Sequence, residues 1–133
     1  MAVDRNLKLN WIEASKLEDP KDEQWELLKK ADGVVVPGGF GERGLEGKIS
    51  AISYVRNNDV PFLGICLGMQ ASVIEYARNV CGVPCNSEEF SKKGNDAVIF
   101  MPEGDKEKMG GTMRLGSRAT VLKEGSIAAK IYG

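Results

Sequence analysis

The most regular pattern in the chain is a helical spacing of apolar residues between two short apolar runs. Leu45, Ile49 and Ile52 recur at intervals that place them on one face of a helix. Polar turn-forming residues follow at Asn57 and beyond. The spacing therefore predicts a helix over Leu45–Asn57, with this face turned toward the core.

The runs on either side of this helix are too short for helices and predict strands. Val34–Val36 is β-branched and too apolar for a solvent-exposed face, so we expect a buried parallel strand. Phe62–Ile65 predicts the next strand, and Leu67–Val80 a second helix. The residues expected on the buried face of that helix are Met69, Val73, Tyr76, Ala77 and Val80. This alternation predicts an α/β fold with a mostly parallel sheet and helices on both faces.

Weaker patterns lie toward both ends of the chain. Leu7–Ile12 alternates apolar and polar residues, which predicts a short strand. Pro20–Lys30 has an acidic start and a basic end and predicts a helix, with Trp25, Leu28 and Ala31 on one face.

The second half is less regular. Residues 81–95 are rich in turn-forming residues, and the composition of 102–108 predicts a charged loop. Ala97–Met101 and Ala119–Leu122 predict strands, and Ser126 predicts the N-cap of a last helix.

A glycine–cysteine–glycine turn joins the second strand to the second helix. Gly64, Cys66 and Gly68 have the G-x-C-x-G form of a nucleophile elbow. The turn is tight, and we expect a Cβ at either glycine to collide with neighbouring backbone. A thiol held there lies at a helix N-terminus, whose dipole favours the reactive thiolate. The alternative is a buried cysteine in a glycine-rich turn.

A second glycine-rich segment, Pro37–Gly41, follows the first strand. Parallel strands place ligand sites at their carboxyl ends, so we expect this loop and Cys66 to lie close together. The backbone amides of Gly39 and Leu67 are then candidate donors to an oxyanion. The alternative is a plain strand-to-helix turn. The segment lacks the lysine and the spacing of a phosphate-binding loop.

Composition narrows the class of protein. The 133 residues are 42% hydrophobic and 28% charged, which suits one globular domain. A net charge of −1 gives no electrostatic reason to expect nucleic acid or a membrane as partner. Three cysteines without a C-x-x-C pair indicate neither a disulfide framework nor a zinc site, and reduced cytoplasmic thiols are the simplest interpretation. The sequence has no histidine, so a Cys–His mechanism lacks its base here.

Four motifs together carry a family resemblance. They are Val36–Gly41, Gly64–Gln70, Asn86–Phe90 and Gly110–Gly116. The chain, from about Leu7 to Gly133, resembles the carboxy-terminal class I (triad) glutamine amidotransferase domain of the CTP synthase family.

The resemblance implies an activity and a set of site residues. Cys66 would attack the side-chain amide of glutamine, form a glutamyl thioester and release ammonia, while the amides of Gly39 and Leu67 hold the oxyanion. The residues that the resemblance implies for substrate binding are Gly38, Gly39, Phe40, Leu67, Gln70 and Glu89. It implies no metal in this part of the protein.

It also implies partners outside the chain. Ammonia would pass to a synthetase domain that uses ATP and Mg²⁺ to aminate UTP to CTP. GTP would activate the glutaminase step, and the whole cytoplasmic enzyme would be a homotetramer.

The departures from the family pattern are large. The family's catalytic His-x-Glu motif and the synthetase domain are not in these residues. We therefore interpret residues 1–133 as a partial glutaminase domain, with little activity alone. Two alternatives remain: another cysteine-elbow α/β protein, such as a thiol hydrolase or redox protein, and a non-catalytic remnant that binds a partner.

Overall fold

The computed structural model describes residues 6–90, 97–100 and 119–132. The chain divides into two compact units, 1–101 and 102–133. The charged loop 102–108 and the motif Gly110–Gly116 lie outside the described residues.

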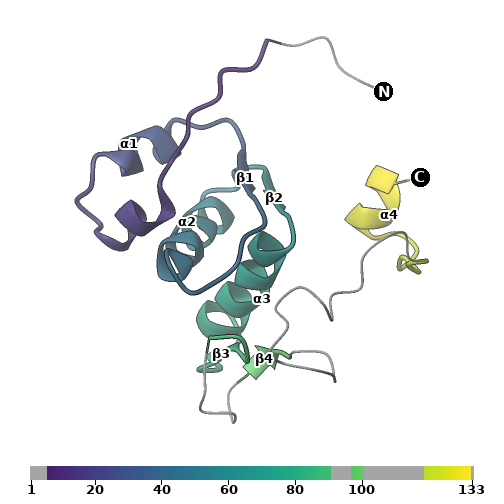
Figure 1. Cartoon of the computed structure of the whole chain (residues 1–133). Coiled ribbons are helices and arrows are strands. Elements are labelled where there is room, and N and C mark those ends of the chain that lie inside the picture. The colour runs from purple at the N-terminus through teal and green to yellow at the C-terminus, as the bar shows by residue number, and fades with distance from the viewer. Residues whose placement is uncertain (1–5, 91–96, 101–118, 133) are drawn as a thin grey trace. The chain divides into compact units, whose positions relative to one another are not determined.

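The centre of the first unit is a pair of parallel strands. β1 (Val34–Val36) pairs with β2 (Phe62–Gly64), and helix α2 (Leu45–Asn57) connects them. Helix α3 (Leu67–Asn79) follows β2 and packs against α2 and both strands (Figure 1). The predicted strand–helix–strand–helix order is confirmed, and α2 has the predicted bounds.

Two clusters of buried side chains hold these elements together. The larger lies between β1, α2 and α3 and contains Val36, Leu45, Ile49, Ile52, Ala71, Ile74 and Cys85. The smaller contains Leu17, Leu28, Ala51 and Val55. The helical spacing of Leu45, Ile49 and Ile52 thus identified the inner face of α2 correctly.

The predicted buried face of α3 was wrong. Four of its five members are exposed, at 39–53% of their surface: Met69, Val73, Tyr76 and Val80. Only Ala77 packs against the larger core cluster. The buried face instead consists of Leu67, Gly68, Ala71, Ile74 and Glu75. Small residues are needed here because α3 lies directly on β1. A pattern of large apolar residues does not reveal that glycine, alanine or a paired glutamate lies on the buried face.

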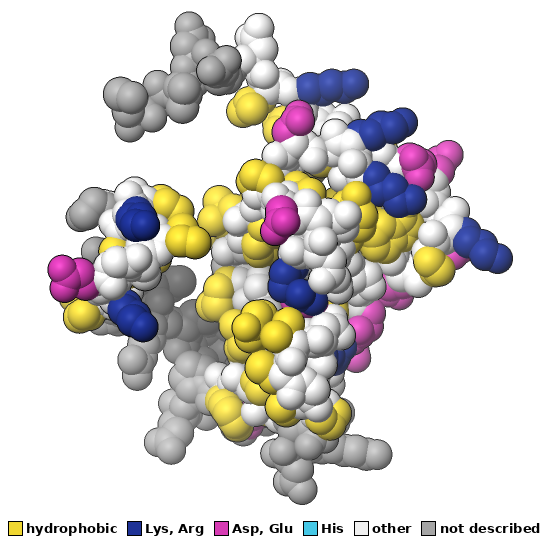
Figure 2. Space-filling view, turned by 180° about the vertical axis from the view of Figure 1, so that it is seen from behind, with side chains coloured by type: hydrophobic (Ala, Val, Ile, Leu, Met, Phe, Trp, Pro, Cys, Tyr) yellow, Lys and Arg dark blue, Asp and Glu magenta, His cyan; other side chains and the backbone are white. Residues whose placement is uncertain are grey.

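One face of the strand pair is also more exposed than predicted. Val36 is buried, but Val35 is 59% exposed and its register partner Leu63 is 53% exposed. The expected burial of all of Val34–Val36 was therefore wrong for Val35. Figure 2 shows hydrophobic side chains in several patches on the surface seen from behind.

The predicted strand at Leu7–Ile12 was wrong as well. These residues are irregular, and Leu7, Leu9 and Trp11 are exposed. A strand needs a hydrogen-bonding neighbour, and none of the described strands lies beside this segment. Helix η1 (Ala14–Glu18), a short 3-10 helix, follows it and packs against α2.

The predicted helix over Pro20–Lys30 is shorter in the structure. α1 spans Gln24–Lys29 and is preceded by turns. Leu28 is buried and Trp25 packs against the smaller cluster, as expected for its inner face.

A second pair of parallel strands lies later in the chain. β3 (Asn86–Ser87) pairs with β4 (Ala97–Ile99). β4 was predicted, over a longer range, whereas β3 was not. The predicted strand Ala119–Leu122 was wrong, since these residues are irregular and exposed.

The second unit, where the structure describes it, ends in a short helix. α4 spans Ile127–Tyr132, and the Ala129 amide donates to Ser126 Oγ at 3.1 Å. The predicted N-cap at Ser126 is therefore confirmed.

An ion pair between the half-exposed Arg56 and the buried Glu75 joins α2 to α3. Arg56 Nη2 lies 2.8 Å from Glu75 Oε1, and the Arg56 Nε–H donates to Glu75 Oε2 at 3.0 Å. The Glu75 side chain is only 1% exposed, and Asn79 donates to it as well. These donors, Arg56 foremost, lower the pKa of Glu75 below its ordinary value of 4.5 although burial acts in the opposite direction.

No described helix is long and apolar enough to span a membrane. No group of three or more Cys, Asp or Glu side chains among these residues is arranged to hold a metal ion.

Candidate active site at the cysteine elbow

Cys66 occupies a strained position between β2 and α3. Its φ is 53° and its ψ is −111°, a backbone conformation that residues other than glycine rarely adopt. Such a residue costs on the order of 1–3 kcal/mol and persists only where the surroundings impose it. The Cys66 residue is exposed and its thiol is free. The predicted strained turn is therefore confirmed.

The glycines on either side of Cys66 are required by close backbone contacts. A Cβ at Gly64 would lie 2.8 Å from the backbone of Gly68. A Cβ at Gly68 would overlap the carbonyl oxygen of Val36 in β1. Both collisions were expected from the G-x-C-x-G pattern. They show that α3 begins directly against the end of β1.

Backbone hydrogen bonds fix the elbow on both sides of Cys66. The Ile65 amide donates to the Val36 carbonyl at 2.9 Å, and the Gly68 amide donates to the Ile65 carbonyl at 2.9 Å. The Gln70 amide donates to the Cys66 carbonyl at 3.1 Å. Leu67 is the first residue of α3, and an N–H at that position has no acceptor within the helix.

The glycine-rich loop after β1 lies against the cysteine. A Cβ at Gly38 would be 3.2 Å from Cys66 Cβ and 3.8 Å from its Sγ. A Cβ at Gly39 would be 3.6 Å from Leu67 Cδ2. The two strand ends therefore bring the loop and the thiol together, as the order of elements predicted.

A third segment reaches the same loop from β3. The Gly41 amide donates to Glu89 Oε1 at 3.3 Å, across 48 positions of sequence. Nothing in the hydrophobic pattern indicated this contact, although Glu89 was expected at the site from the family resemblance. Gln70 is half-buried in the first turn of α3, and the Phe40 side chain is 65% exposed.

Among the described residues, this arrangement has a nucleophile and a glycine-rich loop but no histidine base. An exposed thiol lies at a helix N-terminus, with Gly38 of a glycine-rich loop beside it. Thiol nucleophiles of this kind act on acyl carbons when amides are available for the oxyanion. The sequence contains no histidine to take up the thiol proton.

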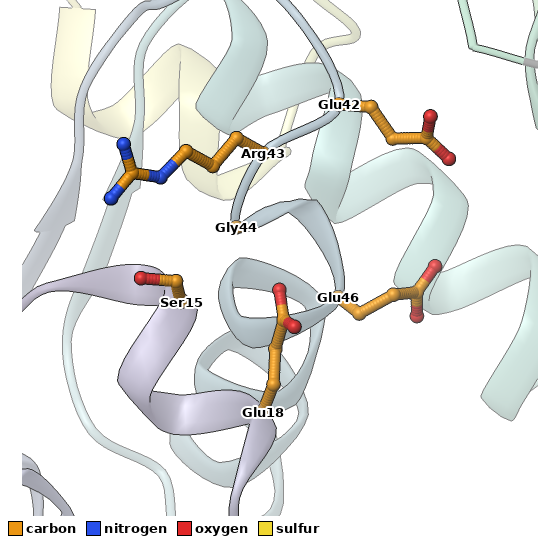
Figure 3. Close-up of a pocket in the computed structure, with 6 residues that line it drawn as sticks. All are labelled: Ser15, Glu18, Glu42, Arg43, Gly44 and Glu46. Atoms are coloured by element: carbon orange, nitrogen blue, oxygen red, sulfur yellow. The ribbon is translucent and has the colours of Figure 1, made fainter.

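A cavity of about 410 Å³ lies elsewhere, between η1 and the start of α2. Its lining residues are Ser15, Glu18, Glu42, Arg43, Gly44 and Glu46. Figure 3 shows Glu42 and Glu46 extending to one side and Arg43 to the other. None of the candidate site residues lines this cavity.

Comparison with known proteins agrees with this geometry. Residues 2–131 match the family "Glutamine amidotransferase class-I". Among solved structures, the chain is similar to the glutaminase domain of the Trypanosoma brucei CTPS with bound acivicin. The TM-score is 0.83 and the sequence identity 40%, over 96% of this chain and 50% of that one.

Two similar curated proteins carry the name CTP synthase. The chain is 52% identical to the CTP synthase of Dictyostelium discoideum, over 93% of this chain and 23% of the relative. It is 50% identical to the CTP synthase of Schizosaccharomyces pombe, over 98% of this chain and 24% of the relative. The chain thus spans about a quarter of the length of these relatives. Since the family match runs through nearly all of its residues, the chain belongs to the class I glutamine amidotransferase family.

Proposed function

We propose that this chain is the glutaminase portion of a CTP synthase, which hydrolyses L-glutamine and supplies ammonia for the amination of UTP. The observation that carries the proposal is the placement of the Gly38 backbone against the thiol of Cys66, at a strained elbow. The CTP synthases that align with almost the whole chain support the choice of substrate.

In this proposal Cys66 is the nucleophile. Its sulfur attacks the side-chain amide carbon of glutamine, and the carbonyl oxygen becomes an oxyanion that accepts hydrogen bonds from the amides of Leu67 and Gly39. Collapse of this intermediate, with a proton delivered to the leaving nitrogen, expels ammonia and leaves a glutamyl thioester. Water then cleaves the thioester to glutamate and restores the thiol. These 133 residues include no histidine, so the proposal assigns the proton acceptor to another part of the protein.

The residues that we assign to substrate binding belong to three segments near this nucleophile. Gly38 and Phe40 belong to the loop beside Cys66, and Gln70 lies in the first turn of α3. The Glu89 carboxylate reaches the same loop and suits the ammonium group of an amino acid. These assignments are part of the proposal, supported by the proximity of the three segments.

The rest of the reaction is assigned to other parts of the protein. We propose that a synthetase domain, with ATP and Mg²⁺, consumes the ammonia, and that GTP activates the glutaminase step. We also propose that the whole enzyme is a cytoplasmic homotetramer without nucleic-acid or membrane partners. The names of the curated relatives support the synthetase partner.

Covalent labelling tests the nucleophile. The chain is treated with acivicin, the compound bound to the T. brucei glutaminase domain, and the adduct is mapped by peptide mass spectrometry. We expect one adduct, at Cys66, which disappears in Cys66→Ser and persists in the matched control Cys81→Ser, where another exposed thiol is removed. Equal modification of Cys66 and Cys81 would count against the proposed function.

A further inference from the structure

The loop beside Cys66 has a tether that the proposed reaction does not itself require. The Gly41 amide donates to Glu89 Oε1 at 3.3 Å, and Gly41 has a φ of +82° that favours glycine. Within the residues that the structure describes, this hydrogen bond ties the backbone of the Gly38–Gly41 loop to a distant segment. The loop is otherwise irregular and largely exposed.

Hydrogen bonds from backbone amides of the turn after β3 hold Glu89 in place. Its amide donates to the Oγ of Ser87 at 3.2 Å, and Ser87 is only 1% exposed. The Phe90 amide donates to the Ser87 carbonyl at 3.1 Å, and the Glu88 amide to the Ile99 carbonyl of β4 at 2.8 Å. The turn that carries Glu89 is therefore fixed to the second strand pair, so its carboxylate can hold the Gly41 amide in a defined position.

We propose that Glu89 is a positioning residue for the oxyanion loop. By holding the Gly41 amide, its carboxylate sets where Gly38 and Gly39 lie against Cys66 and Leu67. This inference rests on the proposed function and deepens it, because Glu89 then has a second role besides binding the substrate.

The chemistry of a carboxylate allows both roles at once. Its two oxygens accept several hydrogen bonds, so one oxygen can hold Gly41 while the group still attracts the ammonium of glutamine. Substrate binding at Glu89 would then restrain the loop that carries the oxyanion donor. Binding and preorganisation of the oxyanion site are coupled through one side chain.

Hydrogen exchange separates the two roles. In Glu89→Gln the side chain keeps an oxygen acceptor for Gly41 but loses its charge, whereas Glu89→Ala loses both. We expect amide exchange in the peptide covering residues 37–41 of the 133-residue chain to rise about tenfold in Glu89→Ala and to stay near the unmodified rate in Glu89→Gln. Glu42→Ala, which removes an exposed carboxylate next to Gly41, is the matched control and should leave the rate unchanged.

Two further readouts make the result decisive. Exchange in the peptides of β1 and α3 shows whether each variant is folded, and the comparison is made relative to those peptides. An unchanged loop in Glu89→Ala, or an equal rise in Glu89→Gln, would overturn the positioning role. Acivicin labelling of Cys66 is scored separately and should be slower in both Glu89 variants. Absence of labelling in the unmodified chain would contradict the proposed function without touching the exchange result.

Discussion

Cys66 stands in a backbone conformation that glycine adopts more readily than cysteine. Its positive φ is imposed by β2 on one side and by the start of α3 on the other. The backbone contacts at Gly64 and Gly68 are so close that neither position has space for a side chain. Strain of this kind is typical of functional sites, where the surroundings compensate for an unfavourable residue. The position can therefore be tested through stability as well as through reactivity.

Relief of strain at Cys66 is the first prediction. Cys66→Gly should be more stable than Cys66→Ala by about 1 kcal/mol, because the relief outweighs the greater flexibility of glycine in the unfolded chain. Urea denaturation of the two variants measures the difference. Ala71→Gly, in the middle of α3, is the control and should be destabilising. A Cys66→Ala variant more stable than Cys66→Gly would show that the elbow is not strained.

Close packing at Gly68 gives the second prediction. Gly68→Ala should lower the free energy of unfolding by about 1–3 kcal/mol, because the added methyl group overlaps the Val36 carbonyl. Gly33→Ala is the control, since its Cβ would meet only ordinary contacts at 3.6 Å and beyond. The measurement is again urea denaturation. Similar stabilities for the two variants would mean that α3 does not begin against β1.

At the scale of elements, the packing of α3 on α2 depends on a polar contact as well as on apolar side chains. Glu75 takes a core position on α3 and is matched there by Arg56 from α2. The pKa of Glu75 is lowered in the folded state, chiefly by hydrogen bonds from Arg56. The carboxylate therefore stabilises the fold above its unfolded pKa of about 4.5, and this contribution is lost as the pH falls through the lower folded value.

The third prediction follows from this linkage. As the pH falls below about 4.5, the urea midpoint of the unmodified chain should drop more steeply than that of Glu75→Gln, which has no charge to lose. Glu46→Gln is the control, because the Glu46–Arg78 pair is more exposed and should change stability by less than about 1 kcal/mol at pH 7. Parallel pH profiles for Glu75→Gln and the unmodified chain would contradict the role assigned to this pair.

The sequence predicted elements well where periodicity and burial coincide. The spacing of Leu45, Ile49 and Ile52 located α2, since its inner face is uniformly apolar. The same reasoning failed for α3, whose inner face uses small and paired residues while Met69 and Tyr76 are exposed. It also failed at Leu7–Ile12, because alternation does not supply a neighbouring strand.

The candidate site was predictable from motifs to a different extent. Two glycine-containing turns at the ends of successive parallel strands were enough to bring Gly38 and Cys66 together. The contact from Glu89 to Gly41 was not, because it joins segments far apart in sequence through one backbone amide. Contacts of this kind leave no periodic signal in a single sequence.

At the scale of the whole molecule, the absence of histidine predicts a low glutaminase activity for the 133-residue chain. The fourth prediction is that the 133-residue chain alone has glutaminase turnover lower by about 10²–10⁴-fold than an intact family member, the range typical of lost general acid–base assistance. A steady-state assay of ammonia release from glutamine provides the measurement. Turnover close to that of an intact enzyme would mean that another residue of this chain serves as the base.

The central claim is that Cys66 is a nucleophile in a glutamine-binding site, and protection by substrate tests it most directly. The chain is alkylated with iodoacetamide with and without a high concentration of L-glutamine, and the modification rate of each cysteine is followed by peptide mass spectrometry. Cys81 is exposed and serves as the internal reference, while Cys85 is buried. We expect glutamine to slow modification of Cys66 and to leave Cys81 unchanged. Modification of Cys66 that is indifferent to glutamine would contradict the account.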